Sequence, residues 1–201
     1  MIHLRGHTAL VTGSTKGVGR SIVEAFAAAG ANVIVQGRRH TDEADVVLHA
    51  CRAHGVRAEF VAGDLSAETG TAVANLTNDV LTTFPETDIL VNNAGTYIDK
   101  PFLEMDLPTY EYTMRLNVAA PYFLTQAFAK HWIAQGTRGR VLMIGSINGR
   151  LAEPTHTCYD SSKGAIEMMV RSLCVTLAPL GIRVNGLAPG LVRTPLTSVI
   201  C

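Results

Sequence analysis

The chain has 201 residues, of which 47% are hydrophobic and 17% are charged. Because an average soluble domain carries roughly 25% charged residues, this composition excludes disorder and predicts a large core. The length would just allow two small domains, but no repeat or linker divides the chain, so we expect one domain over residues 1–201. Seventeen Lys and Arg balance seventeen Asp and Glu, so the formal net charge is zero. A neutral chain is poorly suited to binding a polyanion, and we expect no nucleic-acid partner.

No segment has the pattern of a membrane span, a secretory leader or a metal site. No apolar run approaches roughly 18 residues, and the first one ends at Gly13, so we expect neither a signal peptide nor a membrane partner. The cysteines form no CxxC pair, which predicts reduced thiols and a cytoplasmic location; they are Cys51, Cys158, Cys174 and Cys201. In His49-x-Cys51-x-x-His54 the histidines lie about 140° apart on a helix, so no metal is expected.

Short apolar runs alternate with longer helical patterns along the chain. The runs predict strands at residues 9–12, 32–36, 58–62, 89–92, 141–145 and 182–187. The helical patterns lie at 18–29, 42–54, 66–83, 107–134 and 159–180. Continuous apolar strands are typical of strands buried on both faces, so we expect an α/β fold with a doubly wound parallel sheet and helices on both faces. Ligands of such sheets bind beyond the carboxyl ends of the strands.

The first strand is followed by Thr12-Gly-Ser-Thr-Lys-Gly-Val-Gly19, which then opens a helix. The glycines permit a tight turn and let a pyrophosphate approach the backbone, while the helix N-terminus supplies unpaired N–H groups. Spaced glycines also occur in ordinary turns. The strand before and the helix after favour the phosphate-binding interpretation.

The end of the second strand indicates which dinucleotide binds. Its sequence is Gln36-Gly-Arg-Arg39, with no carboxylate before Asp42 to hold the ribose 2′-hydroxyl of NAD. Arg38, Arg39 and Lys16 would instead suit the 2′-phosphate of NADP. The alternative is that the arginines merely solvate a turn. We predict NADP(H), with NAD(H) as the second candidate.

A tyrosine and a lysine lie on the inward face of the helix at 159–180. Residues 159, 163, 166, 170, 173 and 177 form one helical stripe, and its last four members are apolar. Tyr159 and Lys163 therefore point inward, where Lys163 could alternatively reach the rim and Tyr159 cap the core. An ammonium one turn away stabilises a phenolate, and lowering the phenol pKa by about three units takes about 4 kcal/mol.

The helix at 107–134 carries one amide on its expected inward stripe, which comprises Tyr110, Met114, Asn117, Pro121, Leu124 and Phe128. The Asn117 amide could hold a water, although on its own a structural role is favoured because buried amides need partners. Pro121 removes a helical donor and frees a carbonyl near Asn117.

Taken together and in this order, these motifs resemble the short-chain dehydrogenases/reductases over nearly the whole chain. The matching positions are Thr12-Gly-x-x-x-Gly-x-Gly19, Asp64, Asn92-Asn-Ala-Gly95, Asn117, Ser146, Tyr159-x-x-x-Lys163 and Pro189-Gly190. The resemblance implies a Rossmann-type fold and hydride transfer between NADP(H) and a ketone or secondary alcohol. A lipase-type role for Ser146 is excluded because no Gly-x-Ser-x-Gly surrounds it.

The resemblance also implies residue roles. Tyr159 would be the general acid or base, Lys163 would lower its pKa and bind the nicotinamide ribose, Ser146 would hold the substrate carbonyl, and Asn117 would position a relay water. Asp64 would bond the adenine and Thr194 would meet the carboxamide. The full expected cofactor set is Gly13, Ser14, Thr15, Lys16, Gly17, Val18, Gly19, Arg38, Arg39, Asp64, Leu65, Asn93, Ala94, Gly95, Tyr159, Lys163, Pro189, Gly190, Val192 and Thr194.

The chain departs from the family pattern at its end, because members usually continue for some fifty residues beyond Thr194 with a last helix and strand. Three explanations are open: an incomplete chain, which we favour, a partner that covers the sixth strand, or a truncated protein with damaged turnover. A non-catalytic NAD(P)-binding sensor or scaffold is the alternative function. We also expect a homodimer or homotetramer through the helices at 107–134 and 159–180, the latter presenting a second apolar strip of Ala165, Met168, Met169 and Val175.

Overall fold

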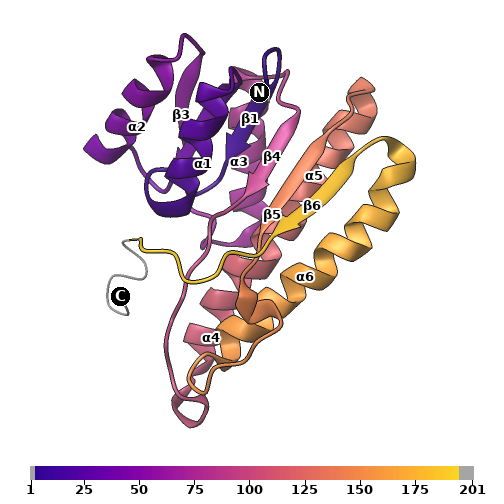
Figure 1. Ribbon diagram of the computed structural model, residues 1–201. Helices are drawn as coiled ribbons and strands as arrows, with labels where there is room; N and C mark the ends of the chain where they lie inside the picture. Colours follow the sequence, from indigo (N-terminus) through magenta and orange to yellow (C-terminus); the bar gives the residue numbers. More distant parts are fainter. Residues whose placement is uncertain (1–2, 195–201) are drawn as a thin grey trace.

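The computed structural model describes residues 3–194 and contains one parallel sheet between two layers of helices (Figure 1). The strands are β1 (Thr8–Val11), β2 (Asn32–Gly37), β3 (Ala58–Ala62), β4 (Ile89–Asn92), β5 (Arg140–Ile144) and β6 (Arg183–Leu187). Their order across the sheet is β3-β2-β1-β4-β5-β6, and every pairing is parallel. The doubly wound α/β fold predicted from the sequence is confirmed, with strand bounds that agree within one residue.

The helices cover both faces of the sheet (Figure 1). They are α1 (Gly17–Ala28), α2 (Asp42–Arg52), α3 (Thr69–Thr83), α4 (Leu107–Met114), α5 (Ala120–Gln135) and α6 (Thr157–Leu177). Neighbouring residues of a strand point to opposite faces, so Leu10 packs with α3, α5 and α6 whereas Val11 packs with α1 and α2. Both faces of the central strands are therefore buried, which explains their uninterrupted apolar sequences.

The strand order reverses between β1 and β4, and the loops that follow these strands nearly touch. A Cβ atom on Gly13 would lie 3.0 Å from the Cα of Ala94, and Gly13 has a φ of +61°, so only glycine fits there. The Thr12 hydroxyl donates to the carbonyl of Val91 and accepts from the main-chain N–H groups of Asn93 and Ala94 at 2.9 Å each. This crossing point is where such sheets bind ligands.

Helix α3 begins three residues later than the expected start of the helix at 66–83. The Glu68 carboxylate accepts hydrogen bonds from the N–H groups of Gly70 and Thr71 at 2.8 and 2.7 Å, so it caps the helix at its first turn. Before it, Ser66 closes a turn by donating from its N–H to the Asp64 carboxylate. The residues before Thr69 thus form a turn next to the sheet.

The expected single helix at 107–134 is interrupted by a π-helical turn at Arg115–Ala119 between α4 and α5. The wider turn shifts the register of α4 against α5. Thr113 is consequently buried at 1% exposure, whereas Tyr110, expected on the inward stripe, is 43% exposed. The prediction for Tyr110 is wrong, while Asn117, Pro121, Leu124 and Phe128 are buried as expected.

The inward stripe of α6 is confirmed, because Lys163, Ile166 and Leu177 are buried. The second apolar strip is only partly correct. Met168 and Val175 are 57% and 78% exposed, but Met169 packs into the chain's own core at 8% exposure. An apolar surface on α6 therefore exists but excludes Met169.

Three of the cysteines lie within residues 3–194, and all three are free thiols; Cys201 falls outside the described residues. Within the same range, no group of three His, Cys, Asp or Glu side chains is arranged to hold a metal ion. The described helices include none with the length and apolar character needed to cross a membrane.

Candidate active site

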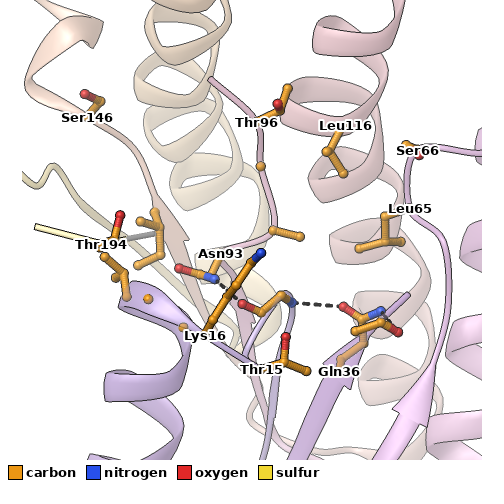
Figure 2. Close-up of a pocket in the computed structure, with 18 of the residues that line it drawn as sticks. Thr15, Lys16, Gln36, Leu65, Ser66, Asn93, Thr96, Leu116, Ser146 and Thr194 are labelled. Atoms are coloured by element: carbon orange, nitrogen blue, oxygen red, sulfur yellow. Dashed lines mark hydrogen bonds between the residues drawn. The ribbon is translucent and has the colours of Figure 1, made fainter. Parts of the chain in front are cut away.

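A cavity of about 420 Å³ opens at the carboxyl ends of the strands, at the crossing between β1 and β4 (Figure 2). Most of the residues expected to form the site line it. They are Gly13, Thr15, Lys16, Gly17, Val18, Gly19, Arg38, Asp64, Leu65, Asn93, Ala94, Gly95, Ser146, Tyr159, Lys163, Pro189, Gly190, Val192 and Thr194. The structure thus brings together residues from six separate strand ends.

Further residues line the same cavity although the sequence analysis did not single them out: Gln36, Gly37, Gly63, Ser66, Thr96, Tyr112, Leu116, Ile144 and Gly145. Most of them directly neighbour predicted site residues at the strand ends. Gln36 could have been found from the sequence, because a polar residue inside an apolar strand suggests a specific role. Tyr112 and Leu116 could not have been found from the sequence, because the π-helical turn decides which side of that segment faces the cavity.

Three expected site residues do not line the cavity: Ser14, Arg39 and Asn117. Ser14 is fully buried, and its hydroxyl donates to the carbonyl of Val11 at 2.7 Å and accepts from the N–H of Gln36 at 3.0 Å. The Ser14 side chain therefore joins the loop after β1 to β1 and β2, and it does not face the cavity. Arg39 is exposed to solvent, and only its neighbour Arg38 reaches the cavity.

The loop after β1 has the form of an anion-binding turn. Gly13 and Gly17 have φ values of +61° and +58°, which L side chains rarely adopt. Helix α1 then begins with an N-cap, Lys16, whose side chain makes no capping hydrogen bond and extends into the cavity (Figure 2). The main-chain N–H groups of the first turn are therefore directed at the space that a phosphate would fill.

Asn93 lines the cavity, and its side-chain nitrogen is bonded to the loop after β1. Its Nδ2 donates to the carbonyls of Thr12 and Gly13 at 2.8 and 3.1 Å. A Cβ atom on Gly19 would lie only 2.4 Å from this nitrogen, so the helix approaches as closely as glycine allows. Asn93 thereby ties the end of β4 to the loop after β1.

The cavity is lined by charged residues near the ends of β2 and β3. Lys16 and Arg38 bring positive charge, whereas the end of β2 carries no carboxylate. Asp64 is the acid at this end, and its Oδ1 accepts from the N–H and the hydroxyl of Ser66 at 2.9 and 2.6 Å. The Ser66 hydroxyl bond lowers the pKa of Asp64, so this carboxyl is ionised at neutral pH.

Tyr159 lies in the first turn of α6 and lines the cavity together with Ser146, which follows β5 by two residues. Burial raises the pKa of the Tyr159 phenol, and its hydrogen bond with Ser146 lowers it in part. The net direction is upward, opposite to the lowering expected from the sequence. The physical reason is that burial disfavours the charged phenolate more than the nearby groups favour it. Tyr159 is therefore a neutral hydroxyl donor at neutral pH.

Lys163 follows Tyr159 by one helical turn and is 8% exposed. Its Nζ donates a hydrogen bond to the carbonyl of Ile144 at 3.0 Å and lies 5.6 Å from the centre of the Tyr159 ring. Burial lowers the pKa of Lys163 to about 8. The ammonium is thus held at the base of the cavity rather than extended to the rim.

The Asn117 side chain is committed to internal contacts. Its Oδ1 accepts from the N–H of Thr96 at 2.8 Å, and its Nδ2 donates to the Thr96 carbonyl at 2.9 Å and to the Ser162 hydroxyl at 3.0 Å. These bonds fix the loop after β4 to α6. These contacts agree with the structural interpretation of Asn117, and the relay water that the resemblance implies stays a prediction.

A second tyrosine packs edge-on against Tyr159. The Tyr97 ring lies 5.2 Å from the Tyr159 ring at an interplanar angle of 83°, and its hydroxyl bonds to Nε2 of His156. Burial raises the pKa of Tyr97, so its hydroxyl keeps its proton. Tyr97 and His156 thus add hydrogen-bonding groups beside Tyr159.

Fold and cavity together define a Rossmann-type α/β domain in which one cavity joins a phosphate-type loop to a Ser–Tyr–Lys cluster. Comparison with known proteins identifies the family to which this domain belongs. The family model described as short chain dehydrogenase matches residues 7–200. The chain belongs to the short-chain dehydrogenase/reductase family, a family of oxidoreductases.

Several relatives match most of the chain. It is 33% identical over 196 residues to L-rhamnose 1-dehydrogenase (NADP(+)) of Thermoplasma acidophilum, covering 98% of this chain and 76% of the relative. It is 37% identical over 193 residues to L-xylulose reductase of Mus musculus, covering 96% and 75%. The structure of a gluconate 5-dehydrogenase from Burkholderia cenocepacia in complex with NADP and tartrate superimposes with a TM-score of 0.90 at 32% identity, covering 98% of this chain and 76% of that chain.

Proposed function

We propose that this chain is an NADP(H)-dependent oxidoreductase that interconverts a ketone and a secondary alcohol, with Tyr159 transferring the proton. The observation that carries the proposal is the shared cavity, in which Tyr159 and Ser146 lie beyond the phosphate-type loop. A binding protein without catalysis would need only the loop. The Ser–Tyr–Lys cluster in the same cavity favours an enzyme.

The residues present fit NADP(H). The close approach of Gly13 to Ala94 leaves a backbone surface that a pyrophosphate can contact, and the α1 N-terminus faces it. Lys16 and Arg38 would hold the 2′-phosphate, while the missing carboxylate at the end of β2 disfavours NAD. The relative from Thermoplasma acidophilum is named for NADP(+), and the Burkholderia cenocepacia structure contains NADP. When bound, the nicotinamide supplies or accepts the hydride.

Tyr159 is suited to giving a proton to the substrate oxygen during reduction. Because burial raises the pKa of its phenol, the hydroxyl is fully protonated at neutral pH. Ser146 lines the same cavity, and its single hydroxyl proton would be donated to the substrate oxygen when substrate is bound, so two donors would converge where negative charge develops. In oxidation the same pair would act in reverse, and the phenolate would accept the proton.

Lys163 would stabilise the phenolate that remains after proton transfer. Its pKa of about 8 leaves it protonated at neutral pH, and its bond to the Ile144 carbonyl fixes the charge near Tyr159. A charge held in a poorly solvated place acts more strongly than one in water. The same ammonium would contact the nicotinamide ribose, whose hydroxyls are good acceptors for it.

For the substrate we propose a polyhydroxylated carbonyl compound, such as a sugar or sugar acid. The Tyr97 hydroxyl and His156 Nε2, which are bonded to each other, form a polar pair next to the Tyr159 ring, and polar surroundings suit substrate hydroxyls better than an alkyl chain. The matched relatives named above are called L-rhamnose 1-dehydrogenase, L-xylulose reductase and gluconate 5-dehydrogenase. These names support the same class.

We further propose a homodimer or homotetramer formed through α4, α5 and α6. Exposed apolar side chains gather on these helices: Tyr110, Tyr122, Phe123, Met168 and Val175. A shallow groove along α4 and α5 is lined by Tyr110, Met114, Val118, Tyr122 and Phe123, together with Thr69, Glu111, Arg115 and Ala119. Large exposed apolar surface of this kind is typical of protein–protein contacts.

The test is a substrate screen with both reduced cofactors. Purified protein is mixed with NADPH or NADH and with polyhydroxylated ketones, simple alkyl ketones or acyl thioesters, and oxidation of the cofactor is followed by absorbance. We expect the highest kcat/KM with NADPH and a polyhydroxylated ketone. A chain that binds NADPH but turns over no carbonyl compound, and no alcohol with NADP+, would support the sensor alternative instead.

A further inference from the structure

Gln36 is a polar side chain buried in the floor of the cavity, with 2% exposure, at the end of β2. Its Oε1 accepts from the N–H of Gly13 at 2.9 Å (Figure 2). Its Nε2 donates to the carbonyl of Gly63 at 2.7 Å and to that of Gly37 at 3.2 Å. The amide orientation follows from this chemistry, because the reverse would set an oxygen against two carbonyls and an NH₂ group against an N–H.

The main chain of Gln36 is bonded to the same loop. Its N–H donates to the Ser14 hydroxyl at 3.0 Å, and its carbonyl accepts from the N–H of Ser14 at 2.9 Å. The loop after β1 is therefore fastened to one residue of β2 at two consecutive positions. Asn93 holds Gly13 from the opposite side, through the Gly13 carbonyl. Both polar groups of the Gly13 residue are thus bound by side-chain amides.

The hydrogen bonds of the Gln36 side chain are additional to the main-chain bonds that form the sheet. The register of β2 against β3 is already set by main-chain pairing, which places Gln36 opposite Val61 and Gly37 opposite Ala62. The Gln36 amide adds a link between three loops, each of which carries a charged residue of the cavity. Gly13 precedes Lys16, Gly37 precedes Arg38 and Gly63 precedes Asp64. Removing the amide would leave the sheet, the Ser14–Gln36 bonds and the main-chain bond from Gly63 to Gly37 in place, but Gly13 would lose its hydrogen bond to Gln36 and Gly63 would lose the bond that Gln36 donates to its carbonyl.

From these contacts we propose that Gln36 is a positioning residue for NADP(H), which fixes the phosphate loop and the Lys16–Arg38 pair relative to Asp64. The inference rests on the proposed function, because it takes this end of the cavity as the adenosine end of a dinucleotide site. Gln36 acts through other groups, so it should govern cofactor affinity and leave the chemical step unchanged. The ligands whose binding depends on Gln36 are nucleotides with a 2′-phosphate.

Gln36→Met tests the proposal, because methionine has a similar volume and removes all three hydrogen bonds of the side-chain amide. The matched control is Thr87→Val, since Thr87 is 1% exposed and its hydroxyl bonds the Phe84 carbonyl before β4, at the opposite end of the strands. NADP+ and 2′,5′-ADP binding is measured by calorimetry and stability by thermal unfolding. We expect Gln36→Met to raise both Kd values about tenfold, which corresponds to about 1.4 kcal/mol. Its kcat at saturating NADPH should remain close to that of the wild type.

Thr87→Val should lose stability without losing affinity. A folded Gln36→Met protein with wild-type Kd would overturn the proposal, and so would an equal rise of Kd in Thr87→Val, because affinity would then follow stability alone. If the wild-type chain itself binds neither NADP+ nor NAD+, the proposed function fails before Gln36 is tested. The two failures are therefore distinguishable.

Gln36→Glu provides a second test should Gln36→Met fail to fold. The glutamate retains an acceptor for Gly13, but its carboxylate form would face the Gly37 and Gly63 carbonyls, which raises its pKa. Only the protonated form can donate to the Gly63 carbonyl. We expect the NADP+ affinity of Gln36→Glu, relative to wild type at the same pH, to improve as the pH falls from about 8 to about 6. A ratio that does not change with pH would contradict the proposal.

Discussion

The ammonium of Lys163 donates a hydrogen bond to the main-chain carbonyl of Ile144 at 3.0 Å. Lys163 lies one helical turn after Tyr159, and Ile144 lies two residues before Ser146. This bond joins α6 to the end of β5. It keeps a positive charge at the base of the cavity although the side chain is nearly inaccessible. The charge is therefore held by the fold, and its burial has a measurable consequence.

Lys163 should make the stability of the protein depend on pH. Its pKa is 10.5 for an ordinary lysine and about 8 in the folded chain. Between these values the unfolded chain binds more protons, so the free energy of unfolding should rise with pH through this window, by on the order of 3 kcal/mol in total. Urea unfolding of wild type and Lys163→Met between pH 8 and 10.5 measures this, and the methionine variant should lack the rise. Parallel curves for both proteins would show that the fold does not lower the pKa of Lys163.

Arg38 and Arg39 offer a matched pair for the cofactor preference. Only Arg38 lines the cavity, so Arg38→Gln should raise the Kd of NADPH about tenfold, as expected for the loss of a charged hydrogen bond, and leave that of NADH nearly unchanged. Arg39→Gln removes the same charge one residue away and should leave both values within about twofold. Fluorescence titration of the bound nicotinamide gives both constants. Equal effects of the two variants would indicate a general charge effect instead of a 2′-phosphate contact.

Asn117 should matter mainly for stability. Asn117→Ala removes three hydrogen bonds, two of them to the half-buried main chain of Thr96 and one to the buried Ser162 hydroxyl, which should cost about 2–4 kcal/mol of unfolding free energy. Asn78→Ala, on the exposed side of α3, should change it by less than about 0.5 kcal/mol. Urea unfolding of both variants compares the two positions. A wild-type stability for Asn117→Ala would mean that the loop after β4 is held by other contacts.

The proposed assembly makes a prediction about a surface residue. Phe123 on α5 is 44% exposed, and a glutamate there would place a charge in the apolar surface. We expect the wild-type chain to sediment as a dimer or tetramer at micromolar concentration and Phe123→Glu as a smaller species. Val46→Glu, at a residue 53% exposed on α2, should leave the assembly intact. A monomeric wild-type chain would refute the assembly outright.

Much of the fold was predictable because its elements are local and strongly patterned. Strands buried on both faces appear as apolar runs, and the stripe of α6 repeats with the helical period, so both were found with correct bounds or nearly so. The π-helical turn at Arg115–Ala119 was not predictable, because one extra residue in a turn leaves the apolar spacing nearly unchanged. This single deviation turns Tyr110 to the surface and Thr113 inward.

The site was predictable to the extent that it follows strand ends. The roles of individual polar groups depend on partners from other elements, which the sequence does not order in space. Ser14 and Asn93 both lie in glycine-rich loops, yet their side chains bond the main chain. The pKa of Tyr159 depends on how much surface its ring buries, and the spacing from Lys163 alone suggested the wrong direction.

The role of Tyr159 can be measured most directly with Tyr159→Phe, which removes the hydroxyl and keeps the ring that packs against Tyr97. NADPH affinity and steady-state reduction of the best ketone from the screen are measured on both proteins. We predict a Kd within about threefold of wild type and a kcat lower by about 100-fold to 10,000-fold, the range that a positioned proton donor contributes. A phenylalanine variant that reduces the ketone at the wild-type rate would contradict the assignment of the proton donor.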